Sequence, residues 1–153
     1  MIHVRKPANS LEGPMVLAVD DSLTVTTLIE RMLQKEHIRV VTARDGLSAL
    51  SSIADEAPAL ILLDIQLAYM NGYHICQIIH KNPQIRYVPV IMLTGKDDVP
   101  ARMHSRLVGA TEHMTKPFDS AELVKKVKKY LINWQAHVPA RLEIFSDTMP
   151  ITV

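Results

Sequence analysis

The sequence predicts an α/β fold built on a doubly wound, five-stranded parallel sheet. The main observation is an alternation, repeated along the chain, of short runs rich in Val, Ile and Leu with segments that have helical periodicity. Runs of this composition are typical of parallel strands that are buried on both faces. Such strands need crossover helices, which pack on the two faces of the sheet. The chain has 153 residues, of which 48% are hydrophobic, and is long enough to bury one such core.

Five segments are predicted to be strands. Four of them are short apolar runs of the kind that forms the interior of a parallel sheet. The fifth is less apolar, and we expect it because it precedes Pro117 and a final helix. The predicted strands are residues 15–20, 38–43, 59–64, 88–94 and 111–115.

Helical periodicity follows each predicted strand. After the first strand, apolar residues recur at i, i+3, i+4, i+7 and i+8, and Ser22 is placed to cap the helix. The pattern is weakest after the fourth strand, and the last helix places four lysines opposite its apolar stripe. The apolar positions are Val25, Leu28, Ile29, Met32 and Leu33; Leu47, Leu50 and Ile53; Tyr73, Cys76 and Ile79; Met103 and Leu107; and Leu123, Val124, Val127, Tyr130 and Leu131.

Composition excludes several classes of function. The 17 basic and 16 acidic residues give a formal net charge of +1, which argues against binding to nucleic acid. The single cysteine, Cys76, excludes an internal disulfide and favours a reducing compartment. No apolar run is long enough for membrane insertion, and the amino terminus MIHVRKPANS lacks the apolar core of a signal peptide. We therefore expect a cytoplasmic protein.

Polar residues with chemical potential follow several of the predicted strands. Asp20 and Asp21 follow the first strand, Asp64 the third, Thr94 the fourth and Lys116 the fifth. Ligands of doubly wound sheets bind beyond the carboxyl ends of the strands, so these residues should converge at one edge. Taken singly, each has an ordinary explanation: an aspartate can cap a helix or shape a turn, and a lysine before a proline is usually solvated. Their joint occurrence at one edge favours a shared ligand-binding site over these separate structural roles.

The residue types at this edge indicate two kinds of ligand. Three neighbouring carboxylates repel one another, and a hard cation such as Mg²⁺ relieves that repulsion. Lys116 and Thr94 suit an anion, because an ammonium offers only donors and is repelled by a cation. A cation, an ammonium and a hydroxyl around one carboxylate could neutralise a phosphoryl group while that carboxylate attacks phosphorus.

At this point the sequence resembles a known family. The DD pair, the LLD at the end of the third strand, the glycine of MNGY, the LTG of the fourth strand and the segment GATEHMTKPF are similar to receiver domains of two-component response regulators. The resemblance covers about residues 14–134 and implies a flavodoxin-like (βα)5 receiver fold with strand order 2-1-3-4-5. It leaves residues 1–13 as an amino-terminal extension and residues 135–153 as a carboxyl-terminal tail or linker stub.

The resemblance also implies roles for the residues of the site. Asp64 becomes the phosphoacceptor, which takes a phosphoryl group from a phosphohistidine on a sensor histidine kinase or phosphotransfer protein. Asp20, Asp21 and Asp64, with the backbone carbonyl of Gln66, become ligands of Mg²⁺. Lys116 pairs with the carboxylate and then with the phosphate, and its bond to the following proline becomes a candidate cis peptide.

Signal readout and hydrolysis follow from the same resemblance. Thr94 and the residue at position 113 are the expected switch pair, acting on a face made by the fourth helix, fifth strand and fifth helix. His113 stands where most relatives have Tyr or Phe, and Ala68 replaces a proline common in the loop after the acceptor. Gln66 and Lys96 occupy the two positions that tune hydrolysis of the acyl phosphate. The expected partner at the switch face is an unidentified output protein or a second copy of this chain, as a homodimer.

Three functions remain open from the sequence. The first is a phosphorylatable signalling module, which is not an enzyme, and the segment from MNGY to LTGKD also resembles receivers of twitching-motility and pilus-linked chemosensory systems. The second is a pseudo-receiver that binds proteins without being phosphorylated, against which Thr94 and Lys116 argue. The third is a phosphatase that uses an aspartyl phosphate, but such enzymes need an acid where this chain has Gln66.

Overall fold

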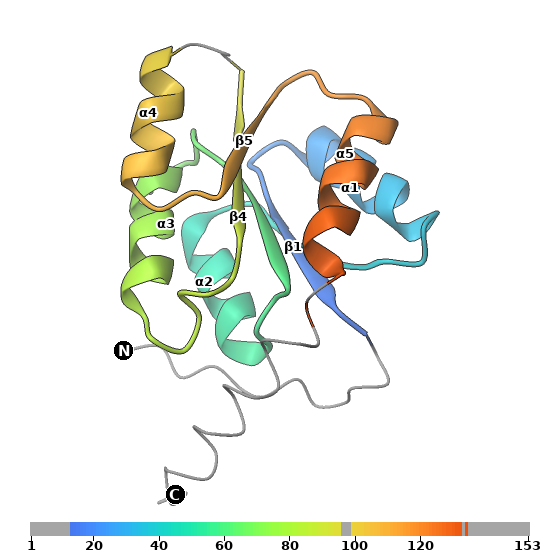
Figure 1. Cartoon of the computed structure of the whole chain (residues 1–153), viewed down its shortest axis with the longest axis horizontal. Coiled ribbons are helices and arrows are strands. Elements are labelled where there is room, and N and C mark those ends of the chain that lie inside the picture. Colours follow the sequence, from blue (N-terminus) through green and yellow to red (C-terminus); the bar gives the residue numbers. More distant parts are fainter. Residues whose placement is uncertain (1–12, 96–98, 133, 135–153) are drawn as a thin grey trace, which may run out of the picture.

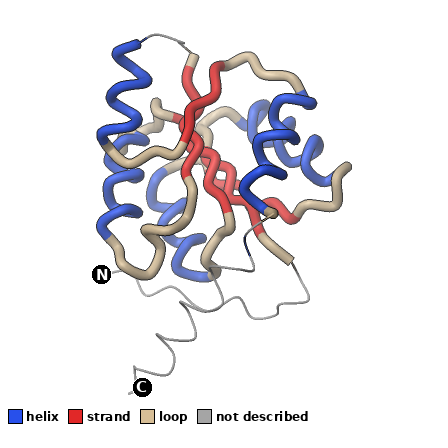
Figure 2. Tube along the Cα trace, viewed as in Figure 1, coloured by secondary structure: helices blue, strands red, loops and turns tan. Residues whose placement is uncertain are grey.

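The computed structural model describes residues 13–95, 99–132 and 134. Five parallel strands form one sheet in the order β2-β1-β3-β4-β5 (Figures 1 and 2), which confirms the predicted fold class and strand order. Each strand lies within a segment predicted from the sequence and starts or ends within two residues of it. The strands are β1 (Met15–Val19), β2 (Arg39–Ala43), β3 (Leu60–Asp64), β4 (Val90–Thr94) and β5 (Glu112–Thr115).

A helix follows each strand, so the chain alternates β and α throughout. Figure 1 shows α2, α3 and α4 on one face of the sheet and α1 and α5 on the other, as right-handed crossovers in a doubly wound sheet require. Four of the helices start at side-chain caps, namely Ser22, Asp45, Asn71 and Asp119. The helices are α1 (Leu23–Gln34), α2 (Gly46–Asp55), α3 (Gly72–Lys81), α4 (Val99–Leu107) and α5 (Ser120–Leu131).

Two apolar cores lie on the two sides of the sheet. Alternate residues of the central strands point to opposite faces, so Leu17 and Leu63 pack with α2 and α3, whereas Ala18 and Leu62 pack with α1 and α5. All five residues of β1, β3 and β4 are buried. The strand ends that follow these buried segments are held rigidly by the two cores, which fixes the position of whatever side chains come next.

Several expectations about packing are wrong, and these include the assignment of Leu28 and Leu47 to the apolar stripes of α1 and α2, since the two residues are 46% and 76% exposed. Residues 38–43 were expected to form a strand buried on both faces, but β2 is an edge strand, and Val41 is 37% exposed. In α4, Met103 and Leu107 were expected to form the buried stripe, yet they are 59% and 83% exposed. The buried side chains are instead Ser105 in the helix and Val108 directly after it. An apolar pattern of two residues cannot distinguish these helix faces.

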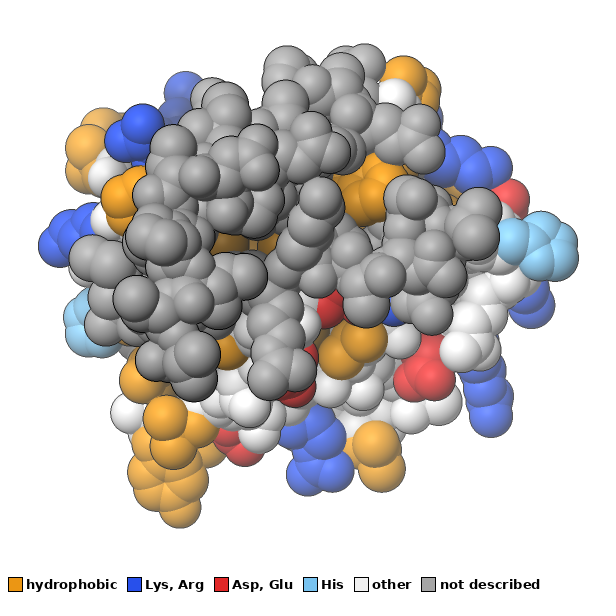
Figure 3. Space-filling view, turned by 90° about the horizontal axis from the view of Figure 1, so that it is seen from below, with side chains coloured by type: hydrophobic (Ala, Val, Ile, Leu, Met, Phe, Trp, Pro, Cys, Tyr) orange, Lys and Arg blue, Asp and Glu red, His pale blue; other side chains and the backbone are white. Residues whose placement is uncertain are grey.

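Some sequence expectations fall on residues outside the described part. These are the amino-terminal extension except for Gly13, the tail at 135–153, and Lys96. Among the described residues, no helix is both long and apolar enough to cross a membrane. Figure 3 shows the pole formed by the amino ends of the strands, where Lys and Arg side chains drawn in colour are interspersed with Asp and Glu around the rim.

Candidate functional site

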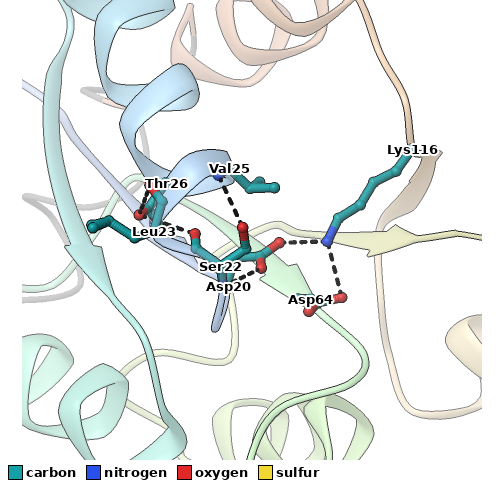
Figure 4. A network of polar contacts seen from close by, with 7 residues as sticks. All are labelled: Asp20, Ser22, Leu23, Val25, Thr26, Asp64 and Lys116. Carbon is teal, nitrogen blue, oxygen red and sulfur yellow. Dashed lines mark hydrogen bonds and ion pairs between the residues drawn. The ribbon is translucent and has the colours of Figure 1, made fainter.

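The two aspartates after β1 have different environments. Asp20 is fully buried, its backbone N–H donates to the carbonyl of Ala43 at 3.1 Å, and its Oδ1 accepts from the N–H of Ser22 at 2.9 Å. Asp21 is exposed. Ser22 caps α1, because its Oγ accepts from the N–H of Val25 at 3.3 Å (Figure 4). Capping of α1 therefore falls to the serine and to neither aspartate.

Lys116 joins the ends of β1 and β3. Its Nζ donates to Oδ2 of Asp20 at 2.5 Å and lies 3.4 Å from Oδ1 of Asp64 (Figure 4). Asp64 is the last residue of β3 and is only 6% exposed. The ammonium thus sits between two buried carboxylates that come from sequence positions far apart, and it offsets part of the cost of burying them.

The charges in this group change one another's ionisation. Burial raises the pKa of Asp64, and the nearby negative charge of Asp20 raises it further, while Lys116 acts in the opposite direction. Burial alone would lower the pKa of Lys116, but its hydrogen bond with Asp20 and the charge of Asp64 raise that pKa overall. The carboxylate of Asp64 is therefore less stable as an anion than an exposed aspartate, and additional positive charge beside it would be stabilising.

Thr94 lies at the end of β4, next to the same group. Its side chain is largely buried, and its backbone carbonyl accepts a short hydrogen bond of 2.6 Å from the N–H of Lys116. The peptide bond between Lys116 and Pro117 is cis, as the resemblance implies. The hydroxyl, the ammonium and the carboxylate of Asp64 line one cleft of about 530 Å³, together with Asp20 and Asp21.

The loop after β3 approaches the backbone of Asp64 very closely. The N–H of Gly72 donates to the carbonyl of Ile65 at 2.8 Å. A Cβ added at Gly72 would overlap the carbonyl oxygen of Asp64 and lie 2.9 Å from the Cα of Ile65. Only glycine fits here without moving the chain. This explains the glycine of MNGY physically, since the residue keeps the end of β3 in place.

The three carboxylates are arranged as a cation site. One carboxylate oxygen from each of Asp20, Asp21 and Asp64 lies within 4.8 Å of the others. Hard oxygen donors of this kind fit Mg²⁺, and the exposure of Asp21 leaves room for the waters that Mg²⁺ retains. Gln66 is exposed on the loop after β3 and lines the same cleft. The donor set is therefore compatible with the cation that the sequence suggests.

His113 lies outside the cleft. It is half-buried on β5 and lines a separate pocket of about 260 Å³ between α4 and α5, with Arg106, Glu112 and Lys126. The Nζ of Lys126 donates to the backbone carbonyl of His113 at 3.3 Å. The five residues predicted to converge therefore line one cleft: Asp20, Asp21, Asp64, Thr94 and Lys116. His113 instead lines the neighbouring pocket.

Tyr73 is a cleft residue that sequence reasoning assigned only to an apolar stripe. It lines the cleft in the first turn of α3, and its ring stacks on that of His104 in α4, with centroids 3.8 Å apart and planes 9° apart. The sequence signal for its place near the cleft is that it directly follows Gly72, which must be a glycine because it packs against the backbone of Asp64. The stack connects the edge of the cleft to the helix that follows Thr94.

Comparisons with known proteins agree with this geometry. The family model "Response regulator receiver domain" matches residues 16–128. Protein PilG of Pseudomonas aeruginosa is 38% identical over 129 residues, which cover 84% of this chain and 90% of PilG. Response regulator PleD of Caulobacter vibrioides is 34% identical over 113 residues, covering 74% of this chain but only 25% of PleD.

The solved structures give the same result. Chemotaxis response regulator CheY4 of Vibrio cholerae superposes with a TM-score of 0.74 at 29% identity, covering 78% of this chain and 99% of that one. A five-stranded parallel sheet in the order 2-1-3-4-5 and an acidic cluster at its carboxyl edge accompany the family match. Its similarity to PilG and to the chemotaxis response regulator CheY4 agrees with the family match, and the chain belongs to the response regulator receiver domain family.

Proposed function

We propose that this receiver is phosphorylated on Asp64 by a phosphohistidine of a sensor histidine kinase or phosphotransfer protein. The observation that carries the proposal is the position of the Asp64 carboxylate, which is buried, lies 3.4 Å from the ammonium of Lys116 and shares an oxygen cluster with Asp20 and Asp21. A structural aspartate at a strand end needs none of these neighbours. Together they prepare one carboxylate to accept an anionic phosphoryl group.

The reaction is a phosphoryl transfer between nitrogen and oxygen. An oxygen of Asp64 attacks phosphorus, the P–O bond forms, the P–N bond to the donor imidazole breaks, and the electron pair returns to that nitrogen. Lys116 neutralises charge on the transferred group, and the hydroxyl of Thr94 donates to a phosphoryl oxygen. Asp20, Asp21, Asp64 and the backbone carbonyl of Gln66 would hold Mg²⁺, which when bound supplies further positive charge to the phosphoryl oxygens.

Readout is proposed to use Thr94 and His113. Phosphorylation adds charge at the carboxyl edge of the sheet, and the movement of Thr94 toward it would free space into which the side chain at 113 can turn. The exposed surface of α4, β5 and α5 then changes shape. An output protein, or a second copy of this chain in a homodimer, would bind there. Gln66 and Lys96 would set the lifetime of the acyl phosphate.

A pseudo-receiver that is never phosphorylated is the second candidate. Such a protein has no need for a lysine between two buried aspartates, because an isolated ion pair of this kind adds little stability over apolar packing. The cluster formed by Asp20, Asp64 and Lys116 therefore favours a receiver that is phosphorylated over a pseudo-receiver.

The test is labelling by a small phosphodonor. The full chain is incubated with acetyl phosphate, with and without Mg²⁺, and analysed by intact-mass spectrometry. We expect an increase of one phosphoryl group that needs Mg²⁺ and is lost in Asp64→Asn. Absence of the adduct in the wild type with Mg²⁺ present would rule the proposal out and leave the pseudo-receiver.

A further inference from the structure

A second cavity opens beside the phosphoacceptor cleft. It has a volume of about 970 Å³ and runs between the start of α2 and the loop after β3. Its lining includes Arg44 and Leu47 on one side, Tyr69 and Met70 on the other, and Asp21 at the end nearest the cleft. Asp21 lines both cavities, and its carboxylate belongs to the oxygen cluster with Asp64. The groove therefore adjoins the cleft at Asp21.

Large apolar side chains gather at this groove. Leu47, in the first turn of α2, is 76% exposed, and Tyr69 is fully exposed. Leu23, which starts α1 two residues after Asp21, is 61% exposed. Single exposed apolar residues are common on protein surfaces, but a group of them around one concave site is typical of a surface that binds another molecule. Leu47 and Tyr69 line the groove, and Leu23 lies at the start of α1 without lining it.

Tyr69 has a backbone conformation that is costly for its residue type. Its φ is +65°, in the left-handed region that Gly, Asn and Asp tolerate better, and the N–H of Met70 donates across it to the carbonyl of Ala68 at 2.8 Å. Since the side chain is fully exposed, its burial within this chain does not offset that cost. Strain of this kind at a site is a reason to suspect a function for the residue.

We propose that this groove is the docking surface for the phosphodonor protein. The inference rests on the proposed function and names the part of the surface that recognises the partner. A protein that occupies the groove also covers Asp21, which lines the cleft as well, so it must come and go with each transfer, as a donor does and a lasting output partner does not. The donor is expected to carry an apolar stripe beside its phosphohistidine, which meets Leu47 and Tyr69.

The experiment compares two kinds of donor on the same variants. The small donor is acetyl phosphate, which needs no docking surface. The protein donor is the fastest among the ³²P-labelled sensor-kinase and phosphotransfer domains encoded in the same genome, screened against the wild-type full chain. The variants are Tyr69→Asn, whose new residue tolerates positive φ, and Leu47→Ser, which removes an exposed apolar side chain.

Two control variants match these changes elsewhere. His37 is the other non-glycine residue with positive φ in the described part, at +59°, and it precedes β2 at the opposite pole, so His37→Asn relieves the same strain away from the site. Ile132 is 78% exposed after α5, so Ile132→Ser removes an exposed apolar side chain away from the groove. Both controls should leave transfer from either donor unchanged.

The expected result is a loss confined to the protein donor. Tyr69→Asn and Leu47→Ser should each lower kcat/KM for transfer from that donor by about tenfold, with the rate from acetyl phosphate unchanged. The Tyr69→Asn variant should in addition melt at or above the wild-type temperature, whereas replacing a residue with a merely structural role would lower the melting temperature.

Other outcomes separate the failures. If acetyl phosphate does not label the wild type, the proposed function itself is wrong. If it does, but no protein donor transfers to the wild type, or transfer from the protein donor is unaffected by both groove variants, the docking surface is wrong while the function stands. Equal losses with both donors mean that the groove shapes the cleft and does not recognise a partner, which also overturns the inference.

Discussion

Lys116 lies closer to Asp20 than to Asp64, with 2.5 Å from its Nζ to Oδ2 of Asp20 and 3.4 Å to Oδ1 of Asp64. The resemblance to receivers implies a pairing of this lysine with the acceptor, but here its shortest contact is with an aspartate of the cation site. The ammonium and a divalent cation would therefore compete for the same carboxylate, because both carry positive charge and both need its oxygens. Binding of Mg²⁺ is expected to weaken the contact with Asp20 and favour the one with Asp64.

Replacement of Lys116 by Met tests this competition. We expect Lys116→Met to bind Mg²⁺ about tenfold more tightly than the wild type in isothermal titration calorimetry, since the competing charge is gone. Without Mg²⁺ the variant should be less stable by about 3 kcal/mol, because it leaves Asp20 buried without a counter-ion, and Mg²⁺ should restore much of that loss. Labelling by acetyl phosphate should fall. Weaker binding of Mg²⁺ by the variant would contradict the competition.

The raised pKa of Asp64 predicts a pH-dependent gain in stability for Asp64→Asn. A group whose pKa is higher in the folded than in the unfolded chain stabilises the fold at low pH and loses that contribution as pH rises through the folded value. Asparagine cannot ionise and avoids this loss. Thermal denaturation without divalent cations should therefore show Asp64→Asn melting above the wild type at pH 7, with the difference shrinking as pH falls toward the ordinary aspartate range, about 3.9. A difference that grows in acid would contradict this assignment.

Gly72→Ala is expected to disturb the end of β3. A Cβ at this position would overlap the carbonyl of Asp64, which is backbone and cannot rotate away, so we expect a loss of stability of about 1–3 kcal/mol. Displacement of Asp64 should also slow labelling by acetyl phosphate. Gly95→Ala is the matched control for stability, since a Cβ at Gly95 meets nothing within 4 Å. Urea denaturation of the two variants measures the difference, and equal stabilities would show that the loop relaxes freely.

A polar contact between β5 and α5 gives a further prediction. The hydroxyl of Tyr130 on α5 donates a hydrogen bond to Glu112 on β5, and Lys126 and Lys129 lie near the same carboxylate. Burial would raise the pKa of Glu112, but the hydrogen bond from Tyr130 and the two lysines lower it overall. We expect Tyr130→Phe to lower the stability at pH 7 by about 1.5 kcal/mol, because a charged acceptor loses its donor.

The pH dependence of that loss identifies its cause. Glu112 has a lowered folded pKa, so its contribution is present above the ordinary glutamate value of about 4.3 and is lost as pH falls through the folded pKa. The difference between Tyr130→Phe and the wild type should therefore shrink in acid. Guanidinium denaturation at several pH values gives the measurement. In the control, Tyr130→Phe is introduced into the Glu112→Gln variant, where it should change the stability little at every pH. A loss independent of pH would point to ring packing alone.

Much of the fold could be predicted because its signals are local. The apolar runs of β1, β3 and β4 are buried on both faces, and such runs have few alternatives in a chain with helical segments between them. Ser22 caps α1 as predicted, because capping depends on a serine and the three residues after it. Edge position is not local, so β2 could not be recognised as an edge strand from its own residues. The exposure of Met103 and Leu107 in α4 could not be predicted either, since two apolar residues do not define which face of a helix is buried.

The sequence by itself determined which residues meet at the carboxyl edge of the sheet, because strand ends are set by local apolar runs and the parallel topology brings those ends together. Only the tertiary structure decided how the charges of that edge are shared: Asp20 is buried and Asp21 exposed, although they are neighbours, and Lys116 contacts Asp20 more closely than Asp64. It also decided that Leu47 and Tyr69, far apart in the chain, face one groove beside Asp21. The physical reason is that burial and distance arise from packing between distant segments, which no short stretch of sequence contains.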